Sequence, residues 1–211
     1  MRIAVFGGTG RIGRQVVPEA LSRGHDVVAL VRDPARLPLR HERLAVVRGD
    51  VRDPDAVRTA VGGADAVISA LGPRRNTRRD EEAHVAGMAN ILRAMRERGV
   101  RRLVTVLGAG IDAEGDRKGP VDRLASRVVR RLARHVHAAK RREFDLLLAS
   151  DDVEWVAARP PIVTGGPGTG RYRADLRRPP GRRIAVGDLA RFLLDQLQED
   201  AFVRKAPFVA S

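Results

Sequence analysis

Short apolar runs alternate with longer amphipathic stretches along almost the whole chain. The apolar runs predict strands at 2–6, 26–31, 44–48, 65–71, 102–107 and 153–158. The stretches between them have helical periodicity, which predicts helices at 12–23, 54–61, 80–98, about 121–149 and 188–198. Uninterrupted apolar strands that alternate with helices are typical of a parallel sheet covered on both faces. The pattern therefore predicts an α/β fold of three layers, a doubly wound parallel sheet of Rossmann type.

The first predicted strand leads directly into a glycine-rich turn. Gly7, Gly10 and Gly13 stand at G-x-x-G-x-x-G spacing, at the start of the helix predicted from residue 12. Without a Cβ at these positions, a pyrophosphate can approach the backbone N–H groups at the start of that helix. Glycine at the last position also lets the helix pack closely against the strand. This context favours a dinucleotide site over a tight turn that binds no ligand.

The end of the second predicted strand indicates which dinucleotide is bound. In folds of this kind an Asp or Glu near this point bonds the ribose 2′-hydroxyl of NAD. This chain has Arg32, whose guanidinium can hold a 2′-phosphate with two hydrogen bonds. We therefore predict NADP(H) as the cofactor. Asp33, the next residue, leaves NAD(H) as the less favoured alternative.

Composition narrows the remaining possibilities. A chain of 211 residues can bury a substantial core, and we expect a single domain over 1–211. The absence of cysteine excludes disulfides, thiolate metal ligands and a cysteine nucleophile, and it fits a cytoplasmic enzyme. Because the first strand begins at residue 2, we expect no signal peptide. No apolar run approaches the ~20 residues of a membrane-spanning helix, so we expect no membrane partner.

The formal net charge of +14 raises the question of nucleic-acid binding. Lysine occurs only at 118, 140 and 205, so nearly all of the positive charge is arginine, as a GC-rich genome would produce. The arginines are scattered, and aromatic residues, which could stack on bases, make up only 3% of the chain. We expect no specific nucleic-acid partner, but a positive field that attracts anionic ligands such as NADPH or a flavin phosphate.

Two stretches interrupt the alternation of strands and helices. Residues 110–122 follow the fifth predicted strand, and residues 160–183, which are rich in proline and glycine, follow the sixth. In a doubly wound sheet both stretches leave the carboxyl ends of strands, where ligands bind. We expect them to form the substrate side of the pocket, the first as a mobile loop. Disordered surface loops are the alternative.

Five segments, taken in order, resemble one known family. They are Ile3–Gly10 (IAVFGGTG), Leu30–Leu37 (LVRDPARL), Val47–Val51 (VRGDV), Asp65–Gly72 (DAVISALG) and Trp155–Pro161 (WVAARPP). Together they resemble the NAD(P)H-binding, NmrA-like branch of the atypical short-chain dehydrogenase/reductases. Gly187-Asp188-Leu189-Ala190 resembles the start of that family's last helix, so the resemblance covers nearly the whole chain.

The resemblance also implies which residues hold the cofactor. The pyrophosphate would lie on the glycine turn, the 2′-phosphate on Arg32 and Arg36, and the adenine beside Asp50 and Val51. Asp50 is equally suited to a turn or N-cap role. The ribose and the nicotinamide would follow the ends of the fourth to sixth strands. The implied set is Gly7, Thr9, Gly10, Arg11, Ile12, Gly13, Arg32, Arg36, Asp50, Val51, Leu71, Gly72, Arg74, Leu107, Gly108, Pro160 and Ile162.

Most catalytic residues of the larger family are missing. Short-chain dehydrogenases use a Tyr-x-x-x-Lys pair and a serine, with the tyrosine as the acid. Lys140 resembles that lysine, but Val136 stands where the tyrosine would be, and the only tyrosine is Tyr172. Gly108 stands where the flavin reductases of the family have a serine. Ile162 stands where a histidine follows the two prolines in such enzymes.

Two residues are therefore our candidates for catalysis. Lys140 is expected to bond the nicotinamide ribose, with an exposed helix lysine as the alternative. His137, beside the vacant tyrosine position, is the candidate proton donor, and His135 and His84 are considered with it. The sequence has no Ser-His-Asp order, no metal-ligand spacing and no Walker loop, so no metal is expected.

The sequence thus favours an NADPH-dependent reductase that passes hydride directly to an electron-poor small molecule, such as a flavin, a quinone or a tetrapyrrole-like ring. Such acceptors need little acid catalysis from the protein, because a reduced flavin can take its proton from water. One alternative is a non-catalytic NADP(H)-sensing regulatory protein of NmrA type. Another is a biosynthetic isomerase, epimerase or dehydratase that keeps the cofactor pocket. Monomer and dimer are both left open.

Overall fold

The centre of the molecule is a six-stranded parallel sheet. The computed structural model describes residues 1–211, apart from the side chains of Ala125 and Val129. The strand order is β3-β2-β1-β4-β5-β6, so the winding reverses between β1 and β4, as in doubly wound folds. The strands are β1 (Arg2–Phe6), β2 (Asp26–Val31), β3 (Leu44–Arg48), β4 (Ala66–Ser69), β5 (Arg102–Val106) and β6 (Glu154–Ala158). The predicted fold class is confirmed.

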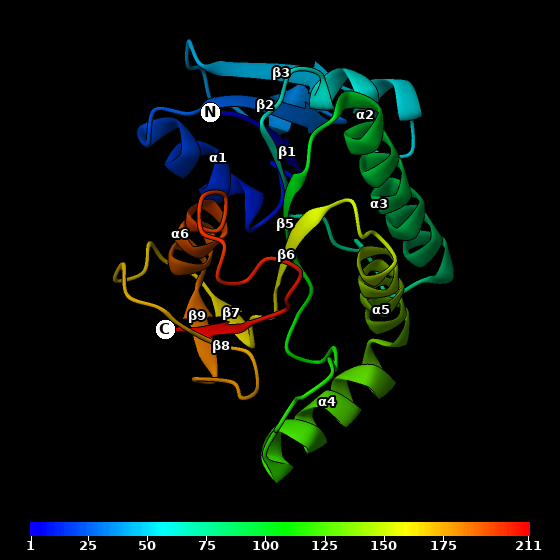
Figure 1. Ribbon diagram of the computed structural model, residues 1–211, viewed down its shortest axis with the longest axis vertical. Coiled ribbons are helices and arrows are strands. Elements are labelled where there is room, and N and C mark those ends of the chain that lie inside the picture. The colour runs from blue at the N-terminus through cyan, green and yellow to red at the C-terminus, as the bar shows by residue number, and fades with distance from the viewer.

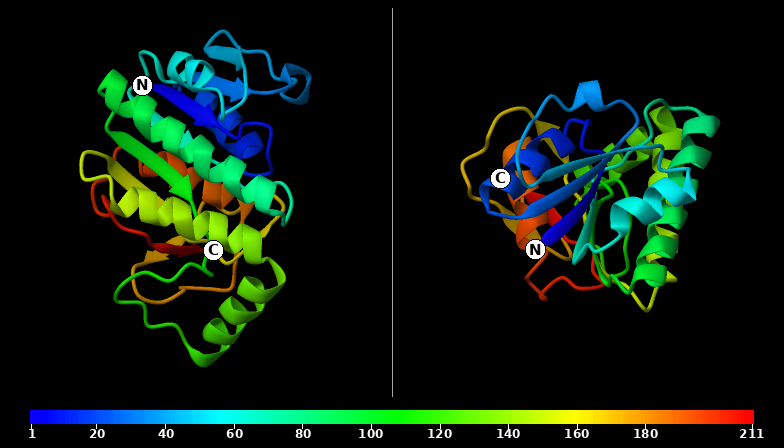
Figure 2. Two further views of the ribbon diagram at one scale, coloured as in Figure 1. Left: turned by 90° about the vertical axis from the view of Figure 1, so that its right-hand side faces the viewer. Right: turned by 90° about the horizontal axis from the view of Figure 1, so that it is seen from above.

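Helices cover both faces of this sheet, which gives three layers (Figure 1). One face carries α1 (Gly13–Ser22) and α6 (Val186–Asp195), and the other carries α2 (Pro54–Val61), α3 (Arg78–Arg98) and α5 (Arg134–Leu148). Successive residues of a strand point to opposite faces. Ala4 and Phe6 therefore pack on the α2–α3–α5 side, whereas Ile3 and Val5 pack on the α1–α6 side. Figure 2 shows the two helical layers from other directions.

Local signals place most element ends close to the predicted positions. β1, β2, β3 and α2 have the predicted bounds, and the other predicted strands begin and end within two residues of them. Asp53 caps α2 because its side chain accepts from the backbone N–H groups of Asp55 and Ala56. Gly99 ends α3 in the left-handed conformation, with φ of 68°.

The long helix predicted at about 121–149 is two helices, and this prediction is corrected. α4 (Pro120–Leu132) ends at Leu132 and α5 begins at Arg134, so Ala133 separates the two helices. Asn76, on the loop after β4, occupies the break: its Nδ2 donates to the Leu132 carbonyl at 2.9 Å, and its Oδ1 accepts from the His135 N–H at 2.9 Å. One side chain thus satisfies the end of one helix and the start of the next.

The stretch 160–183 is not an irregular loop. It contains β7 (Ile162–Thr164) and β8 (Arg173–Asp175). β9 (Arg183–Ala185) directly precedes α6, and β10 (Phe208–Ala210) follows α6 near the end of the chain. β7 pairs with β9 in parallel, and β8 pairs with β10 in antiparallel orientation. A 3₁₀ turn, Pro34–Arg36, follows β2. These short elements were not predicted.

A buried arginine anchors the segment that follows β5. Arg159 at the end of β6 is fully buried, and its two terminal nitrogens reach the Asp116 carboxylate at 2.7 and 2.8 Å. The same guanidinium donates to the carbonyls of Ile111 and Ala206 and lies 3.7 Å from the centre of the Phe208 ring. The expected mobile loop 110–122 is therefore anchored at Ile111 and Asp116, and its last residues belong to α4.

Candidate functional site

The glycine turn after β1 is closed so tightly that side chains cannot enter it. Gly7 has a φ of +82°, and a Cβ built on it would lie 2.7 Å from the Ala70 carbonyl oxygen. A Cβ on Gly13 would lie 2.2 Å from the Gly7 carbonyl oxygen. Within the described residues, no side chain caps the start of α1. The turn therefore leaves backbone N–H groups at a helix N-terminus available to an anion.

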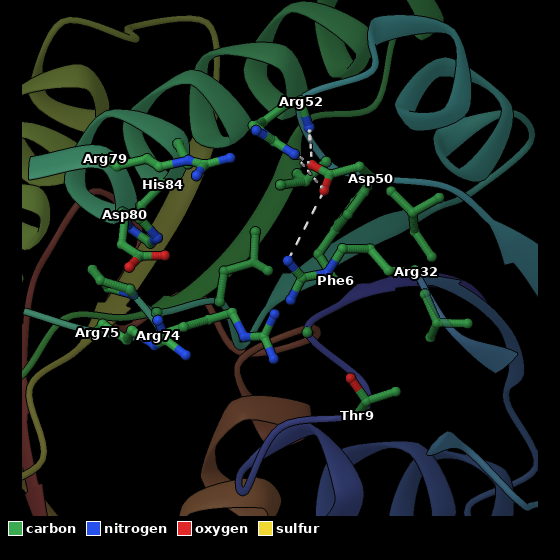
Figure 3. Close-up of a pocket in the computed structure, with 18 of the residues that line it drawn as sticks. Phe6, Thr9, Arg32, Asp50, Arg52, Arg74, Arg75, Arg79, Asp80 and His84 are labelled. Carbon is green, nitrogen blue, oxygen red and sulfur yellow. Dashed lines mark hydrogen bonds and ion pairs between the residues drawn. The ribbon is translucent and has the colours of Figure 1, made fainter. Parts of the chain in front are cut away.

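A pocket of about 680 Å³ opens at the carboxyl ends of β1 to β4 (Figure 3). This volume falls in the range of ligand sites. Many of the predicted cofactor residues line it, namely Gly7, Thr9, Arg32, Asp50, Val51, Leu71, Gly72 and Arg74. His84, which the sequence analysis considered as a proton donor, lines it as well, together with polar residues that sequence reasoning missed, namely Arg52, Arg75, Thr77, Arg79 and Asp80.

The remaining predicted residues lie elsewhere. Gly10, Arg11, Ile12 and Gly13 form the turn and the start of α1, and Arg36 ends the 3₁₀ turn.

The predicted nicotinamide residues lie beyond the pocket, at the adjacent ends of β5 and β6. The Leu107 N–H donates to the Ala158 carbonyl at 2.8 Å, and the Ala109 N–H donates to the Pro160 carbonyl at 2.9 Å. Leu107, Gly108 and Pro160 are thereby brought together. Ile162 begins β7, and its side chain is 62% exposed.

The end of the pocket that we predict to hold adenosine contains an ion-pair network around Asp50. Arg52 donates from Nε and Nη2 to the two Asp50 oxygens at 2.9 and 3.1 Å, and its backbone N–H donates to Asp50 Oδ1. This pairing lowers the pKa of Asp50. Arg32 Nη1 lies 4.0 Å from Asp50 Oδ2, and the Arg32 side chain is 52% exposed. Because Arg52 already neutralises Asp50, Arg32 is available to an anionic ligand.

Asp33 has a local structural role. Its Oδ1 accepts from the Ala35 N–H at 3.1 Å and so caps the 3₁₀ turn that starts at Pro34. A carboxylate that bonds the ribose of NAD would need to face the pocket, whereas Asp33 is absent from the pocket lining. The geometry at this strand end thus favours Arg32 over Asp33 as the residue that contacts the adenosine ribose.

Three further arginines, Arg74, Arg75 and Arg79, surround the opposite wall of the pocket. In the part of the chain that the structure describes, none of them forms an ion pair or side-chain hydrogen bond. Together with Arg32 and Arg52 they outnumber the two carboxylates of the lining, Asp50 and Asp80. The pocket is therefore electropositive and suited to a ligand that carries several phosphates.

Lys140 lies beneath this site, in a buried network. Its Nζ donates to the carbonyls of Leu71 and Val106 at 2.7 and 2.6 Å and to Glu143 Oε2 at 2.8 Å. All three ammonium protons are thus engaged. Leu71 follows β4 and Val106 ends β5, so the ammonium joins the carboxyl ends of two neighbouring strands. Sequence reasoning missed Glu143, although its position three residues after Lys140 places both on one helix face.

Glu143 is fully buried and accepts hydrogen bonds from several directions. His84 Nε2 lies 2.7 Å from its Oε2, and Thr105 Oγ1 donates to its Oε1 at 2.7 Å. Burial by itself would raise the pKa of Glu143, but the charge of Lys140 and the hydrogen bond from His84 outweigh it and bring the pKa to about 2. The pKa of His84 is lowered by burial and by the Lys140 charge. A charged Lys140–Glu143 pair next to a neutral imidazole follows.

The other candidate proton donors are engaged outside the pocket. His135 Nδ1 pairs with Glu81 Oε2 at 2.9 Å, and His137 Nε2 lies 3.3 Å from the Gly110 carbonyl oxygen. Tyr172 donates to Asp195 on α6 and packs edge-on against Phe192. Burial and the Asp195 carboxylate raise the pKa of Tyr172. Tyr172 therefore does not replace the catalytic tyrosine that is missing at position 136.

The fold and the pocket define a dinucleotide-binding protein. The strand order, the glycine turn at the start of α1 and the electropositive pocket at the switch point are the features of that class. The chain belongs to the NAD(P)H-binding family, whose model matches residues 7–200. The predicted family is thus confirmed.

Individual relatives agree with this assignment. A 3 beta-hydroxysteroid dehydrogenase/Delta 5→4-isomerase from Mycobacterium tuberculosis is 35% identical over 135 residues, which cover 56% of this chain and 36% of that enzyme. The curated relatives that this chain matches are much longer than the matched segments, which cover from 12% to 36% of the length of those relatives.

Solved structures with low sequence identity show the same fold. A short-chain dehydrogenase/reductase from Veillonella parvula, in complex with NADP, has a TM-score of 0.80 at 19% identity and covers 100% of this chain and 94% of its own. A Streptococcus pneumoniae protein with a proposed NADH-flavin reductase activity has a TM-score of 0.80 at 22% identity and covers 100% and 99%.

Proposed function

We propose that this protein is an NADPH-dependent reductase that delivers hydride directly to an electron-poor ring, such as a flavin, a quinone or a tetrapyrrole-like molecule. One observation carries the proposal. The two candidate catalytic residues are engaged in structural contacts, Lys140 with three acceptors and His137 with the Gly110 carbonyl, and the only tyrosine, Tyr172, donates to Asp195. An acceptor that needs no acid from the protein fits this site best.

The residues of the pocket fit NADP(H). Arg32 would hold the 2′-phosphate, with Arg36 nearby on the 3₁₀ turn, and the turn from Gly7 to Gly13 would hold the pyrophosphate. The exclusion of side chains at Gly7 and the uncapped start of α1 support this assignment. Arg52 would lie against the adenine, since its guanidinium is fixed in a plane by Asp50. When bound, NADPH supplies the hydride.

We assign Lys140 a positioning role. It fixes the ends of β4 and β5, from which Leu71, Gly72, Leu107 and Gly108 would surround the ribose and nicotinamide. Precise placement of such residues matters because a small displacement of reacting groups costs rate. The expected direct bond between Lys140 and the nicotinamide ribose would require the lysine to give up one of these contacts.

The acceptor side is suited to a flat apolar ring. Leu107 and Pro160 are buried at the adjacent strand ends, and Ile162, which is 62% exposed, offers an apolar surface beyond them. Contact with such side chains would stack a ring on the nicotinamide and exclude water. The proposed NADH-flavin reductase activity of the Streptococcus pneumoniae neighbour supports this choice of acceptor, and the NADP bound to the Veillonella parvula neighbour supports the choice of cofactor.

Acceptor screening tests the proposal. Purified protein is mixed with NADPH and, in turn, FMN, FAD, a quinone and a linear tetrapyrrole, and absorbance at the nicotinamide band is followed. We expect oxidation with at least one of them. NADPH that binds and is never oxidised would instead support the second candidate, an NADP(H)-sensing protein, which the same engaged side chains favour.

Cofactor choice is tested by Arg32→Glu, with Arg48→Glu as a matched control. Arg48 ends the neighbouring strand, is exposed and does not line the pocket, so both variants change the net charge equally. Loss of a charge-assisted contact with the 2′-phosphate predicts about 10- to 100-fold weaker NADPH binding in Arg32→Glu. NADH binding should change little. An equal loss for both cofactors would contradict the role of Arg32.

A further inference from the structure

α4 presents an apolar stripe to solvent. Four of the nine large apolar side chains that the structure shows as exposed lie on it: Val121, Leu124, Val128 and Leu132 are 61%, 62%, 46% and 73% exposed. At 100° per residue these four positions fall within about 80° of the helix circumference. Large side chains at such spacing are normally buried. On α4, by contrast, the apolar stripe is exposed to solvent.

The rest of α4 is strongly basic. Arg123, Arg127, Arg130 and Arg131 are all exposed, and Asp122 is the helix's only acidic residue. Among the described residues, none of these four arginines forms an ion pair or a side-chain hydrogen bond. The helix therefore combines unneutralised positive charge with an exposed apolar stripe.

The position of α4 leaves both features accessible. Figure 1 shows it standing apart from the six-stranded sheet, below α5, at the end of the segment that leaves β5. That segment is held to the body by Arg159, and the last carbonyl of α4 is held by Asn76. The segment that leads into α4 and the last carbonyl of α4 are thus held in place, while the apolar stripe remains exposed to solvent.

We propose that α4 docks the protein on the surface of a membrane that contains anionic lipids. A short helix with an apolar stripe and a basic remainder lies in the interface plane, with the stripe among the acyl chains and the adjacent arginines, here Arg127 and Arg131, at anionic headgroups. Within the described residues, no helix has the length and hydropathy needed to cross a bilayer. Docking in the interface needs no such helix, so the expected absence of a membrane partner is replaced by this proposal.

Charge decides between a membrane and a second copy of the chain. Pairing two α4 helices through their stripes would bring Arg127 and Arg131 of each copy, which lie beside the stripe, to one interface, and Asp122 is the only carboxylate that each helix could offer. Like charges at that spacing repel. An anionic lipid surface offers a negative headgroup to each arginine instead, and the net charge of +14 favours the same approach.

Sedimentation with vesicles tests the proposal without reference to any reductase activity. The full chain is mixed with phosphatidylcholine vesicles that contain or lack phosphatidylglycerol, at low and high salt. We expect binding only to the anionic vesicles, and weaker binding at high salt. Arg127→Gln with Arg131→Gln, the two arginines that lie beside the stripe at 100° per residue, should weaken binding roughly 30-fold, as the loss of two basic contacts predicts. Leu124→Glu with Val128→Glu should abolish it.

Leu148→Glu is the matched control, because Leu148 ends α5 and is 51% exposed. It should bind vesicles as the wild type does, and all variants should bind NADPH unchanged, since the cofactor pocket lies elsewhere. The proposal is overturned if wild-type protein ignores anionic vesicles or if Leu148→Glu loses binding equally. It is also overturned if light scattering finds a dimer that Leu124→Glu with Val128→Glu dissociates.

Discussion

Replacement of Lys140 by methionine separates a positioning role from a catalytic one. The change removes the ammonium that donates to Leu71, Val106 and Glu143 and keeps most of the side-chain length. Glu143, fully buried, then loses its cation and keeps contacts with His84 and Thr105. Burial without a cation raises the pKa of a carboxyl group. Burial, which is the larger cause of the lowered pKa of His84, persists in the variant, so the added proton should go to Glu143 and not to the imidazole.

The cost of that protonation depends on pH. In the unfolded chain Glu143 has its ordinary pKa of 4.5, so adding a proton at pH 7 costs about 3.4 kcal/mol. In the variant, the pKa of Glu143 is higher in the folded protein than in the unfolded chain. The free energy of unfolding of the variant is therefore largest below pH 4.5, and it falls by about 1.4 kcal/mol for each unit by which the pH rises above that value. Wild-type Glu143, whose pKa is lowered to about 2, contributes no such slope above pH 5.

The two strand-end carbonyls add a cost that does not depend on pH. Each loses a donor, which amounts to about 1 kcal/mol apiece. At pH 7 the total is about 5 kcal/mol, which corresponds to a fall of about 10 to 20 °C in the melting temperature for a domain of this size. At pH 5.5 the total should shrink to roughly 3 kcal/mol.

Urea unfolding of wild type, Lys140→Met and Lys140→Met with Glu143→Gln between pH 5.5 and 7.5 provides the measurement. The single variant should show the steep pH dependence, and the double variant should lose it, because glutamine cannot be charged. A loss below about 1 kcal/mol that is equal at every pH, together with abolished NADPH oxidation, would refute the positioning role and restore a catalytic one.

Three other substitutions, one of them with a control, test contacts elsewhere in the protein. Tyr172→Phe should keep NADPH oxidation and lose about 1 kcal/mol of stability, since the hydroxyl serves Asp195; a dead enzyme would make the tyrosine the acid. Asp116→Asn should cost about 3 kcal/mol in urea unfolding, because Arg159 loses its buried partner. Asp152→Asn, whose carboxylate is 54% exposed and pairs with the 44% exposed Arg96, is the control and should change the stability little. Ser69→Ala should be neutral or stabilising, because among the described atoms Ser69 Oγ is buried without a partner; a loss above about 1 kcal/mol would reveal one.

The sequence predicts the parts of the fold that depend on local pattern. β1, β2 and α2 are found at their predicted bounds because buried strands read as apolar runs and Asp53-Pro54 is a strong helix start. The break between α4 and α5 depends on Asn76, which lies 56 residues before Leu132, and no local pattern reveals it. The three-residue strands β7 to β10 pair with distant partners and are too short to show periodicity.

The residues of the candidate site likewise fall into two groups, those that the sequence predicts and those that only the structure reveals. The glycine turn and Arg32 are defined by local spacing, so the sequence is sufficient to place them. Arg52, Arg75 and Arg79 could not be selected among 40 basic residues, because nothing in their spacing distinguishes them from arginines on exposed faces. Only the fold shows that the ends of β3 and β4 bring them to one pocket.

The structure also explains why a lysine can persist at position 140 without the tyrosine that accompanies it in short-chain dehydrogenases. A lysine that only lowers the pKa of a tyrosine would have no function once that tyrosine is replaced by Val136. Lys140 instead satisfies two strand-end carbonyls and the buried Glu143, and none of these contacts involves position 136. Loss of the lysine would leave a carboxyl group buried without its cation. Stability therefore retains the lysine independently of acid catalysis, and its presence is not evidence that the protein transfers a proton.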